Sequence, residues 1–346
     1  MKVLVTGGGG FLGRAVCRQL LARGDQVVAY QRSPAPALAA AGADVVQGDL
    51  LDTGALSKAA ETCDAVIHTA AKAGIWGADE DYRHINVDGT QHVIDVCRAH
   101  GIRRLVHTSS PSVVHDGRDL EDANEFLPYP DHFTAAYPRT KAEAERRVLA
   151  ASGDALKTVA LRPHLIWGPG DPHLLPRLLE RAERGVLRLP GAGKRIDTTY
   201  VDNAALAHLL ALDTLTSAPE RCAGKVYFIS NDQPLTQREI IGALLAAAGR
   251  KVDIRSIPGW VAVVAGTLVE TAWRWRGRED EPPLTRFAAE QLATAHWFDL
   301  AAARSDLGYR PQVSIREGLA RLAAALRARE TRAGAAAQPA GSPAQS

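Results

Sequence analysis

The first residues of the chain combine a short strand, a glycine-rich turn and the start of a helix. Residues 2–6 form a β-branched, apolar run, and four consecutive glycines follow it. Gly7 permits a tight turn, Gly10 lets backbone amides approach a pyrophosphate, and Gly13 allows close helix packing. The alternative is an ordinary flexible glycine loop. The pattern predicts a dinucleotide-binding turn, with contacts from Gly7, Gly10, Phe11, Leu12 and Gly13.

Strands and helices then alternate along the chain. Short runs of β-branched and apolar residues stand at 26–30, 44–46, 64–68, 104–108 and 157–161, with helical stretches between them. Such alternation predicts an α/β fold, a Rossmann-type doubly wound parallel sheet. Ligands of such sheets collect at the carboxyl ends of the strands. Most of the candidate residues below lie at such an end or open the helix beyond it.

The alternation breaks down after Arg162, and this predicts a second, smaller part. We expect a dinucleotide-binding Rossmann domain over residues 1–164, to which 196–230 return. A mostly helical substrate-binding part would occupy 165–195 and 231–329. Within these parts we predict a helix over 80–100, a hairpin or loop over 186–195 and a further strand at 226–229. Residues 330–346 are mostly Ala, Gly, Pro and Ser without periodicity, which predicts a disordered tail.

The segment after the second strand bears on the choice of cofactor. A NAD-binding site would usually place Asp or Glu there to hold the ribose 2′-hydroxyl. This chain has Gln31-Arg32-Ser33 instead. Because no carboxylate repels a 2′-phosphate and a guanidinium can bind one bidentately, the sequence favours NADPH over NADH. The alternative is that Arg32 simply faces solvent.

Further cofactor contacts are expected where the third and fourth strands end. Asp49, followed by Leu50, could accept a hydrogen bond from the adenine amino group. Thr69, Ala70 and Ala71 form a loop of small residues that can lie close to a cofactor.

Tyr137 and Lys141 stand four residues apart at the start of an apolar-periodic helix, and so share one face. A cation about 4 Å from a phenol, at an effective dielectric of about 20, is worth roughly 4 kcal/mol. That is about three units of the tyrosine pKa, ordinarily about 10. Such a pair can make an acidic phenol. Taken alone it also fits a surface pair on an ordinary helix, and the glycine turn and strand-end residues favour catalysis.

Composition narrows the function classes. The chain has 346 residues, and its net charge of +2 gives no case for nucleic acid or an anionic membrane. Four scattered cysteines lack metal-ligand or paired spacing, so we expect reduced thiols, no metal and a cytoplasmic protein. Strand residues begin at the N-terminus, which leaves no room for a signal peptide. The longest apolar run, 260–269, is too short for a transmembrane segment.

Residues 257–276 combine aliphatic side chains with Trp260, Trp273 and Trp275, and end with interleaved Arg274 and Arg276. This stretch could wall an oily substrate pocket, or rest its apolar face on a membrane surface or a partner. The alternative is an ordinary buried helix.

Several motifs together resemble the extended short-chain dehydrogenase/reductases over residues 1 to about 204. They are the glycine turn, Asp49, His68-x-Ala-Ala, Asn86-Val-x-Gly-Thr90, Ser110, Tyr137-x-x-x-Lys141 and Arg162-Pro163 with Gly168-Pro169. Ser109-Ser110-Pro-Ser-Val, residues 161–171, Pro282-Pro-Leu-Thr-Arg-Phe and Ala295-His-Trp-Phe-Asp299 are similar to a closer group. These are the OleD-type reductases of bacterial olefin synthesis, in the branch near the 3β-hydroxysteroid dehydrogenases.

The resemblance implies roles for particular residues. Tyr137 would protonate the alkoxide, and Lys141 would lower the pKa of Tyr137 and hold the nicotinamide ribose. Ser110 would polarise the carbonyl oxygen, although Ser109 and Ser112 are near enough to leave the position open. Asn86 would anchor a proton-relay water. The cofactor-binding set gains Tyr137, Lys141 and Pro163 from the resemblance, and Val114-His115 departs from the family's usual residues after the serine.

The resemblance also implies the reaction. OleD-type enzymes reduce 2-alkyl-3-oxoalkanoic acids with NADPH, and a homodimer and an assembly with other olefin-pathway enzymes remain open. The alternatives are an NAD(P)-dependent hydroxysteroid or sterol dehydrogenase, a nucleotide-sugar epimerase and a non-catalytic dinucleotide-binding regulator. A 3-oxo acid carries a carboxylate that needs a partner, and Arg188 or Arg195 is the candidate, with a solvated loop arginine as the alternative.

Overall fold

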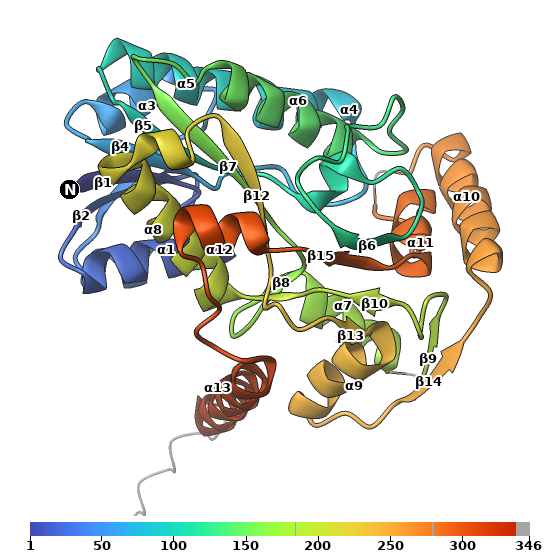
Figure 1. The fold of residues 1–346 in the computed structure, drawn as a ribbon. Coiled ribbons are helices and arrows are strands. Elements are labelled where there is room, and N and C mark those ends of the chain that lie inside the picture. The colour runs from blue at the N-terminus through green and yellow to red at the C-terminus, as the bar shows by residue number, and fades with distance from the viewer. Residues whose placement is uncertain (184, 279, 337–346) are drawn as a thin grey trace, which may run out of the picture.

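A seven-stranded parallel sheet forms the centre of the computed structural model, which describes residues 1–183, 185–278 and 280–336 (Figure 1). The strand order is β12-β7-β5-β4-β1-β2-β3. The strands are β1 (Lys2–Thr6), β2 (Gln26–Gln31), β3 (Asp44–Gln47), β4 (Ala65–His68), β5 (Arg104–Thr108), β7 (Lys157–Pro163) and β12 (Lys225–Ile229). The order reverses beside β1, where a doubly wound sheet opens its ligand crevice. The predicted fold class is confirmed.

Helices cover both faces of this sheet because successive strand residues point to opposite sides. Val3 and Val5 of β1 belong to one apolar core cluster, and Leu4 between them belongs to the other. Helices α1 (Phe11–Ala22) and α8 (Val201–Ser217) pack together on one face. Helices α3 (Thr53–Ala60), α5 (Gly89–Ala99) and α6 (Ala136–Ala150) line the opposite face (Figure 1). The short α2 (Pro36–Ala40) precedes β3.

The smaller part contains short strands as well as helices. A four-stranded sheet has the order β13-β10-β15-β6, and the pairs β8–β11 and β9–β14 are separate. These strands are β6 (Leu120–Ala123), β8 (Ile166–Trp167), β9 (Val186–Leu189), β10 (Arg195–Ile196), β11 (Thr199–Tyr200), β13 (Leu235–Thr236), β14 (Asp253–Ser256) and β15 (His296–Phe298). The helices are α7 (Leu174–Ala182), α9 (Gln237–Ala247), α10 (Gly259–Trp275), α11 (Arg286–Ala293), α12 (Ala301–Leu307) and α13 (Ile315–Ala336).

Residues 186–195, predicted to be a hairpin or a loop, do not form a hairpin. Strand β9 pairs in parallel with β14, and β10 pairs with β13 and β15. The partners therefore come from chain segments tens of residues downstream, which a local turn pattern does not reveal. The predicted strand at 226–229 exists as β12, which pairs in parallel with β7 and extends the central sheet.

The helix predicted over 80–100 is interrupted. It consists of α4 (Asp79–Arg83), a π-helical turn at His84–Asp88 and α5. Single π-helical turns inside a helix are frequent at functional sites. Asn86 stands in this turn with its side chain buried.

The disordered tail predicted over residues 330–346 is wrong for residues 330–336. Helix α13 continues through Ala336, because alanine-rich sequence sustains a helix already started by Ile315. Residues 337–346 lie outside the described part of the chain.

Helix α10 packs on α11 at one edge of the molecule (Figure 1). The exposed fractions of Trp260, Val264, Leu268 and Trp275 are 72%, 51%, 66% and 84%. These residues recur at helical spacing and form one apolar stripe. The alternative of an ordinary buried helix is therefore wrong. The predicted contact of this stretch with a membrane or a partner stays a prediction, and none of the described helices is long and apolar enough to cross a membrane.

A buried ion pair joins helix α6 to strand β7. Arg162 donates from Nε to Glu145 Oε2 at 2.9 Å and from Nη2 to Oε1 at 2.6 Å, and both side chains are at most 2% exposed. The Tyr129 hydroxyl donates to the same carboxylate at 2.6 Å. The Arg162 guanidinium also lies 5.3 Å from the ring centre of Phe228 in β12. This cluster therefore joins α6, β7 and β12.

Removing one charge of this pair should strongly destabilise the fold. We expect Glu145→Gln to lower the free energy of unfolding by about 3–5 kcal/mol, because Arg162 would be left buried without a counter-charge. The matched control is Glu143→Gln. Glu143 is 35% exposed, and its two partners, Arg147 and Arg83, are 31% and 50% exposed. The loss in this control should stay within about 1 kcal/mol. Urea denaturation measures both, and equal losses would contradict the expectation.

Candidate active site

The glycine turn has the backbone geometry that the sequence predicted. Gly7 has a φ of +71°, in the left-handed region that favours glycine. A Cβ atom on Gly13 would lie 2.1 Å from the carbonyl oxygen of Gly7, so any side chain there would push α1 away from the turn. The N-terminus of α1 thus closes tightly on the end of β1, and free amides of its first turn are available to an anion.

A groove of about 660 Å³ runs along this turn. It is lined by most of the residues predicted to bind cofactor: Gly7, Gly10, Phe11, Leu12, Gly13, Arg32, Asp49, Leu50, Thr69, Ala70 and Ala71. Tyr137, Lys141 and Pro163 are not among its lining residues. The sequence did not predict cofactor contacts from Gln31, Lys72, Ile85 and His173, which also line it.

The polar groups of this groove fit a nicotinamide dinucleotide. Gln31 is buried, its Nε2 donates to the Ser33 carbonyl at 3.1 Å, and its Oε1 has no partner among the described residues. A buried acceptor at the end of β2 suits a ribose hydroxyl. Arg32 is exposed on the rim beside it. One oxygen of Asp49 accepts from the Leu51 amide at 2.9 Å, which leaves the other oxygen for the predicted adenine contact.

Lys141 is buried behind the groove. Its ammonium donates to the Thr108 carbonyl at 2.6 Å and lies 3.5 Å from Nε2 of His107. Burial lowers the pKa of Lys141 to about 8, and the Glu145 carboxylate one turn along α6 partly opposes this shift. The same ion pair that anchors α6 therefore favours the charged lysine.

Tyr137 lies in the first turn of α6. Burial raises the pKa of its phenol, and a hydrogen bond from Ser110 partly offsets this. The lowering of the Tyr137 pKa by Lys141 stays a prediction. Ser110 caps the short 3₁₀ helix Pro111–Val114, and its Oγ lies 2.9 Å from that of Ser112. Of the three serines left open by the sequence, Ser110 is the one whose hydrogen bonding lowers the Tyr137 pKa, and its catalytic role stays a prediction.

Asn86 serves as a brace between segments. Its Oδ1 accepts from the Lys72 amide at 2.7 Å, and its Nδ2 donates to the Lys72 carbonyl at 3.2 Å. Nδ2 also donates to Thr140 Oγ1 at 3.1 Å, one residue before Lys141. Both amide N–H groups are engaged, and the proton-relay role stays a prediction. The observed contacts hold the loop after β4 against α6.

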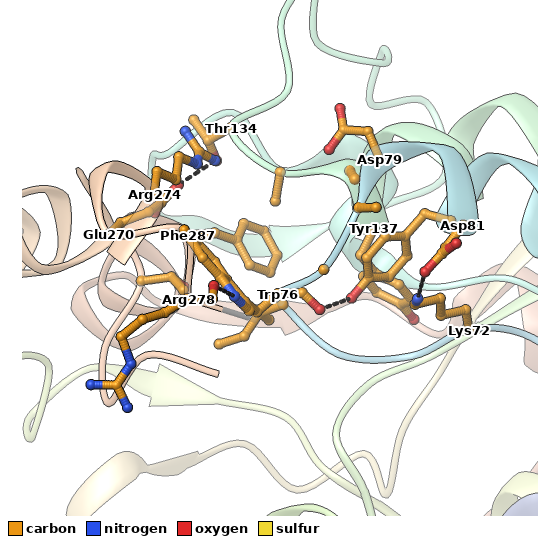
Figure 2. A pocket seen from close by; sticks show the side chains of 18 residues that line it. Lys72, Trp76, Asp79, Asp81, Thr134, Tyr137, Glu270, Arg274, Arg278 and Phe287 are labelled. Atoms are coloured by element: carbon orange, nitrogen blue, oxygen red, sulfur yellow. Dashed lines mark hydrogen bonds and ion pairs between the residues drawn. The ribbon is translucent and has the colours of Figure 1, made fainter. Parts of the chain in front are cut away.

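A second cavity, of about 830 Å³, opens at Tyr137. Figure 2 shows Tyr137, Lys72 and Asp81 on one side and Arg274, Arg278 and Phe287 on the other, with Trp76 between them. The walls come from the loop and helix at 72–82, from 134–137, and from the regions of α10 and α11. Of residues 257–276, only the charged Glu270 and Arg274 line this cavity, so the oily wall predicted from this stretch is wrong for it.

The candidates for binding a substrate carboxylate are elsewhere. Arg188 lies on β9 and Arg195 on β10, both exposed, and neither lines this cavity. The prediction failed because the sequence does not show that β9 pairs with β14 away from Tyr137.

No group of three or more His, Cys, Asp or Glu side chains is arranged for a metal ion in the described residues.

The sheet, the glycine groove and the Tyr137 cavity together define a nicotinamide-dinucleotide-dependent oxidoreductase of the extended short-chain dehydrogenase/reductase class. Residues 4–256 match the 3-beta hydroxysteroid dehydrogenase/isomerase family, and the chain belongs to that family.

Three similar proteins illustrate the relationship. The 2-alkyl-3-oxoalkanoate reductase of Stenotrophomonas maltophilia (strain K279a) is 53% identical over 328 residues, covering 94% of this chain and 99% of the relative. The enzyme of the same name from Shewanella oneidensis is 46% identical, covering 93% and 85%. The structure of MoeE5 in complex with UDP-glucose and NAD has a TM-score of 0.72 at 25% identity, covering 95% of this chain and all of that one.

Replacing the phenol tests the site directly. We expect Tyr137→Phe to lower turnover by about 10²- to 10⁴-fold, the usual effect of losing a positioned acid. Tyr82→Phe is the matched control, since Tyr82 lines the same cavity and its hydroxyl donates to the Trp76 carbonyl at 3.1 Å. The control should lose less than about tenfold. Wild-type turnover in Tyr137→Phe, in an assay limited by chemistry, would remove Tyr137 from the mechanism.

Proposed function

We propose that this enzyme uses NADPH to reduce the 3-keto group of a long-chain 2-alkyl-3-oxoalkanoic acid to the 3-hydroxy acid, in olefin biosynthesis. One observation supports the reaction above the others: Tyr137 opens into an aromatic-walled cavity that meets the dinucleotide groove at Lys72. The names of two near full-length relatives support the substrate class.

Ser110, Tyr137 and Lys141 have different roles as negative charge develops on the carbonyl oxygen. When bound, the dinucleotide would supply the hydride that the carbonyl carbon accepts. As negative charge builds on the carbonyl oxygen, Ser110 donates a hydrogen bond to it and Tyr137 transfers its phenolic proton. Lys141, held on the Thr108 carbonyl, stabilises the phenolate left behind. With a pKa of about 8, Lys141 is mostly charged at neutral pH.

The substrate is tested with NADP⁺-linked oxidation of three compounds: a 2-alkyl-3-hydroxy acid, a 3β-hydroxysterol and UDP-glucose. We expect turnover of the hydroxy acid, with kcat/KM at least about 100-fold above the sterol, a difference of about 2.7 kcal/mol in transition-state binding. Turnover of the sterol alone would establish the hydroxysteroid alternative. Turnover of UDP-glucose alone would overturn the lipid assignment.

Arg32 is proposed to favour NADPH. We expect Arg32→Ala to raise KM for NADPH by about 10- to 100-fold, because a guanidinium bound to a phosphate is lost, and to change KM for NADH less than about threefold. Arg103→Ala, at an exposed arginine outside the groove, is the control. An equal loss for both cofactors would remove Arg32 from the 2′-phosphate site.

The cellular location of the enzyme and its partners are also proposals. A cytoplasmic location agrees with four buried, unpaired cysteines. The exposed stripe of α10 is the surface that would meet a membrane or another olefin-pathway enzyme. A homodimer stays a prediction.

A further inference from the structure

The proposed substrate carries a carboxylate, and none of the catalytic residues named above binds it. In a 3-oxo acid the carboxylate is attached to the carbon next to the ketone. If the ketone oxygen lies at Tyr137 and Ser110, the carboxylate must lie within a few ångströms of them. Its partner should therefore be a cation that lines the cavity at Tyr137.

Three described cations line this cavity: Lys72, Arg274 and Arg278. Arg274 pairs with Glu270 at 2.7 Å, and its side chain is 68% exposed. Arg278 donates twice to Asp280, at 2.7 and 2.6 Å, and is 47% exposed. Both arginines already have carboxylate partners, and both lie on the side of the cavity opposite Tyr137 (Figure 2).

Lys72 differs from the two arginines in its position and in the hydrogen bonds that hold its backbone. It lines both the dinucleotide groove and the Tyr137 cavity. Its backbone is held on both sides by the buried Asn86 amide, so the side chain leaves from a fixed point. The Lys72 side chain is 26% exposed, and its ammonium lies 5.0 Å from the centre of the Tyr82 ring. Figure 2 shows Lys72 on the same side as Tyr137.

The present partner of Lys72 is replaceable. Asp81 accepts from the ammonium at 2.6 Å, but its side chain is 59% exposed and can turn into solvent at little cost. An ammonium has three N–H donors, so two remain for another acceptor. The other nearby carboxylate, Asp79, is paired with Arg139 at 2.6 Å.

We propose that Lys72 is the carboxylate-binding residue of the substrate site and that Asp81 occupies its ammonium until a 3-oxo acid arrives. This inference rests on the proposed function. The brace from Asn86 then has a further purpose, because it holds the charge that orients the acid for hydride transfer. Orientation of the carboxylate by a fixed cation places the ketone at Tyr137.

The test compares a 2-alkyl-3-oxo acid with its neutral methyl ester. We expect Lys72→Gln to raise KM for the acid by about 10- to 100-fold, the effect of losing a hydrogen bond between charged groups, with the ester changed less than about twofold. Lys72→Arg should restore most of the preference for the acid. Asp81→Asn should lower KM for the acid, because it removes the competing carboxylate. Arg83→Gln, at an exposed cation of α4 outside the cavity, is the control.

Each contrary outcome is distinct. An unchanged preference for acid over ester in Lys72→Gln would overturn the assignment of Lys72. A rise in KM for NADPH that is equal with acid and ester would assign Lys72 to a cofactor phosphate and also overturn it. If the wild-type enzyme reduced neither compound, the proposed function itself would fail.

Discussion

The buried pair between Glu145 and Arg162 is the interaction on which the site depends. Both charges are removed from water, a cost that only their two short hydrogen bonds and the Tyr129 hydroxyl offset. The pair fixes α6 against β7, and through the Phe228 ring it also contacts β12. Because Glu145 stands one turn beyond Lys141, the same carboxylate that anchors the helix also favours the charged lysine. Glu145 therefore contributes both to the stability of the fold and to the charged state of Lys141 in the site.

The chemistry lies where two cavities meet. The groove along the glycine turn suits a dinucleotide, and the cavity at Tyr137 has aromatic walls with charges at its rim. Asn86 holds the Lys72 loop to α6 through Thr140, so the border between the two cavities is braced by a buried amide. A reductase needs this arrangement, since cofactor and ketone must meet at one fixed distance from the acid.

The sequence predicted the central sheet well and the smaller part poorly. Strands such as 2–6 and 104–108 are short runs rich in apolar and β-branched residues, and the helices between them have their own periodicity, so the local pattern predicts both. The hairpin over 186–195 was wrong because β9 takes its hydrogen bonds from β14, far along the chain. The π-helical turn at His84–Asp88 also escaped prediction, because its register follows contacts of Asn86 with Lys72 and Thr140.

By itself the sequence determined the doubly wound sheet and the glycine turn, and it predicted a catalytic role for Tyr137 and Lys141. These predictions follow from the spacing of residues within single segments, because a glycine turn or a helical repeat is formed by residues close together in the sequence. The tertiary structure alone decided which described cations line the Tyr137 cavity: they are Lys72, Arg274 and Arg278, and not Arg188 or Arg195. It also shows that Ser110, of three neighbouring serines, is the one whose hydrogen bonding lowers the Tyr137 pKa. The physical reason is that such contacts join segments whose distance in sequence carries no information about their distance in space.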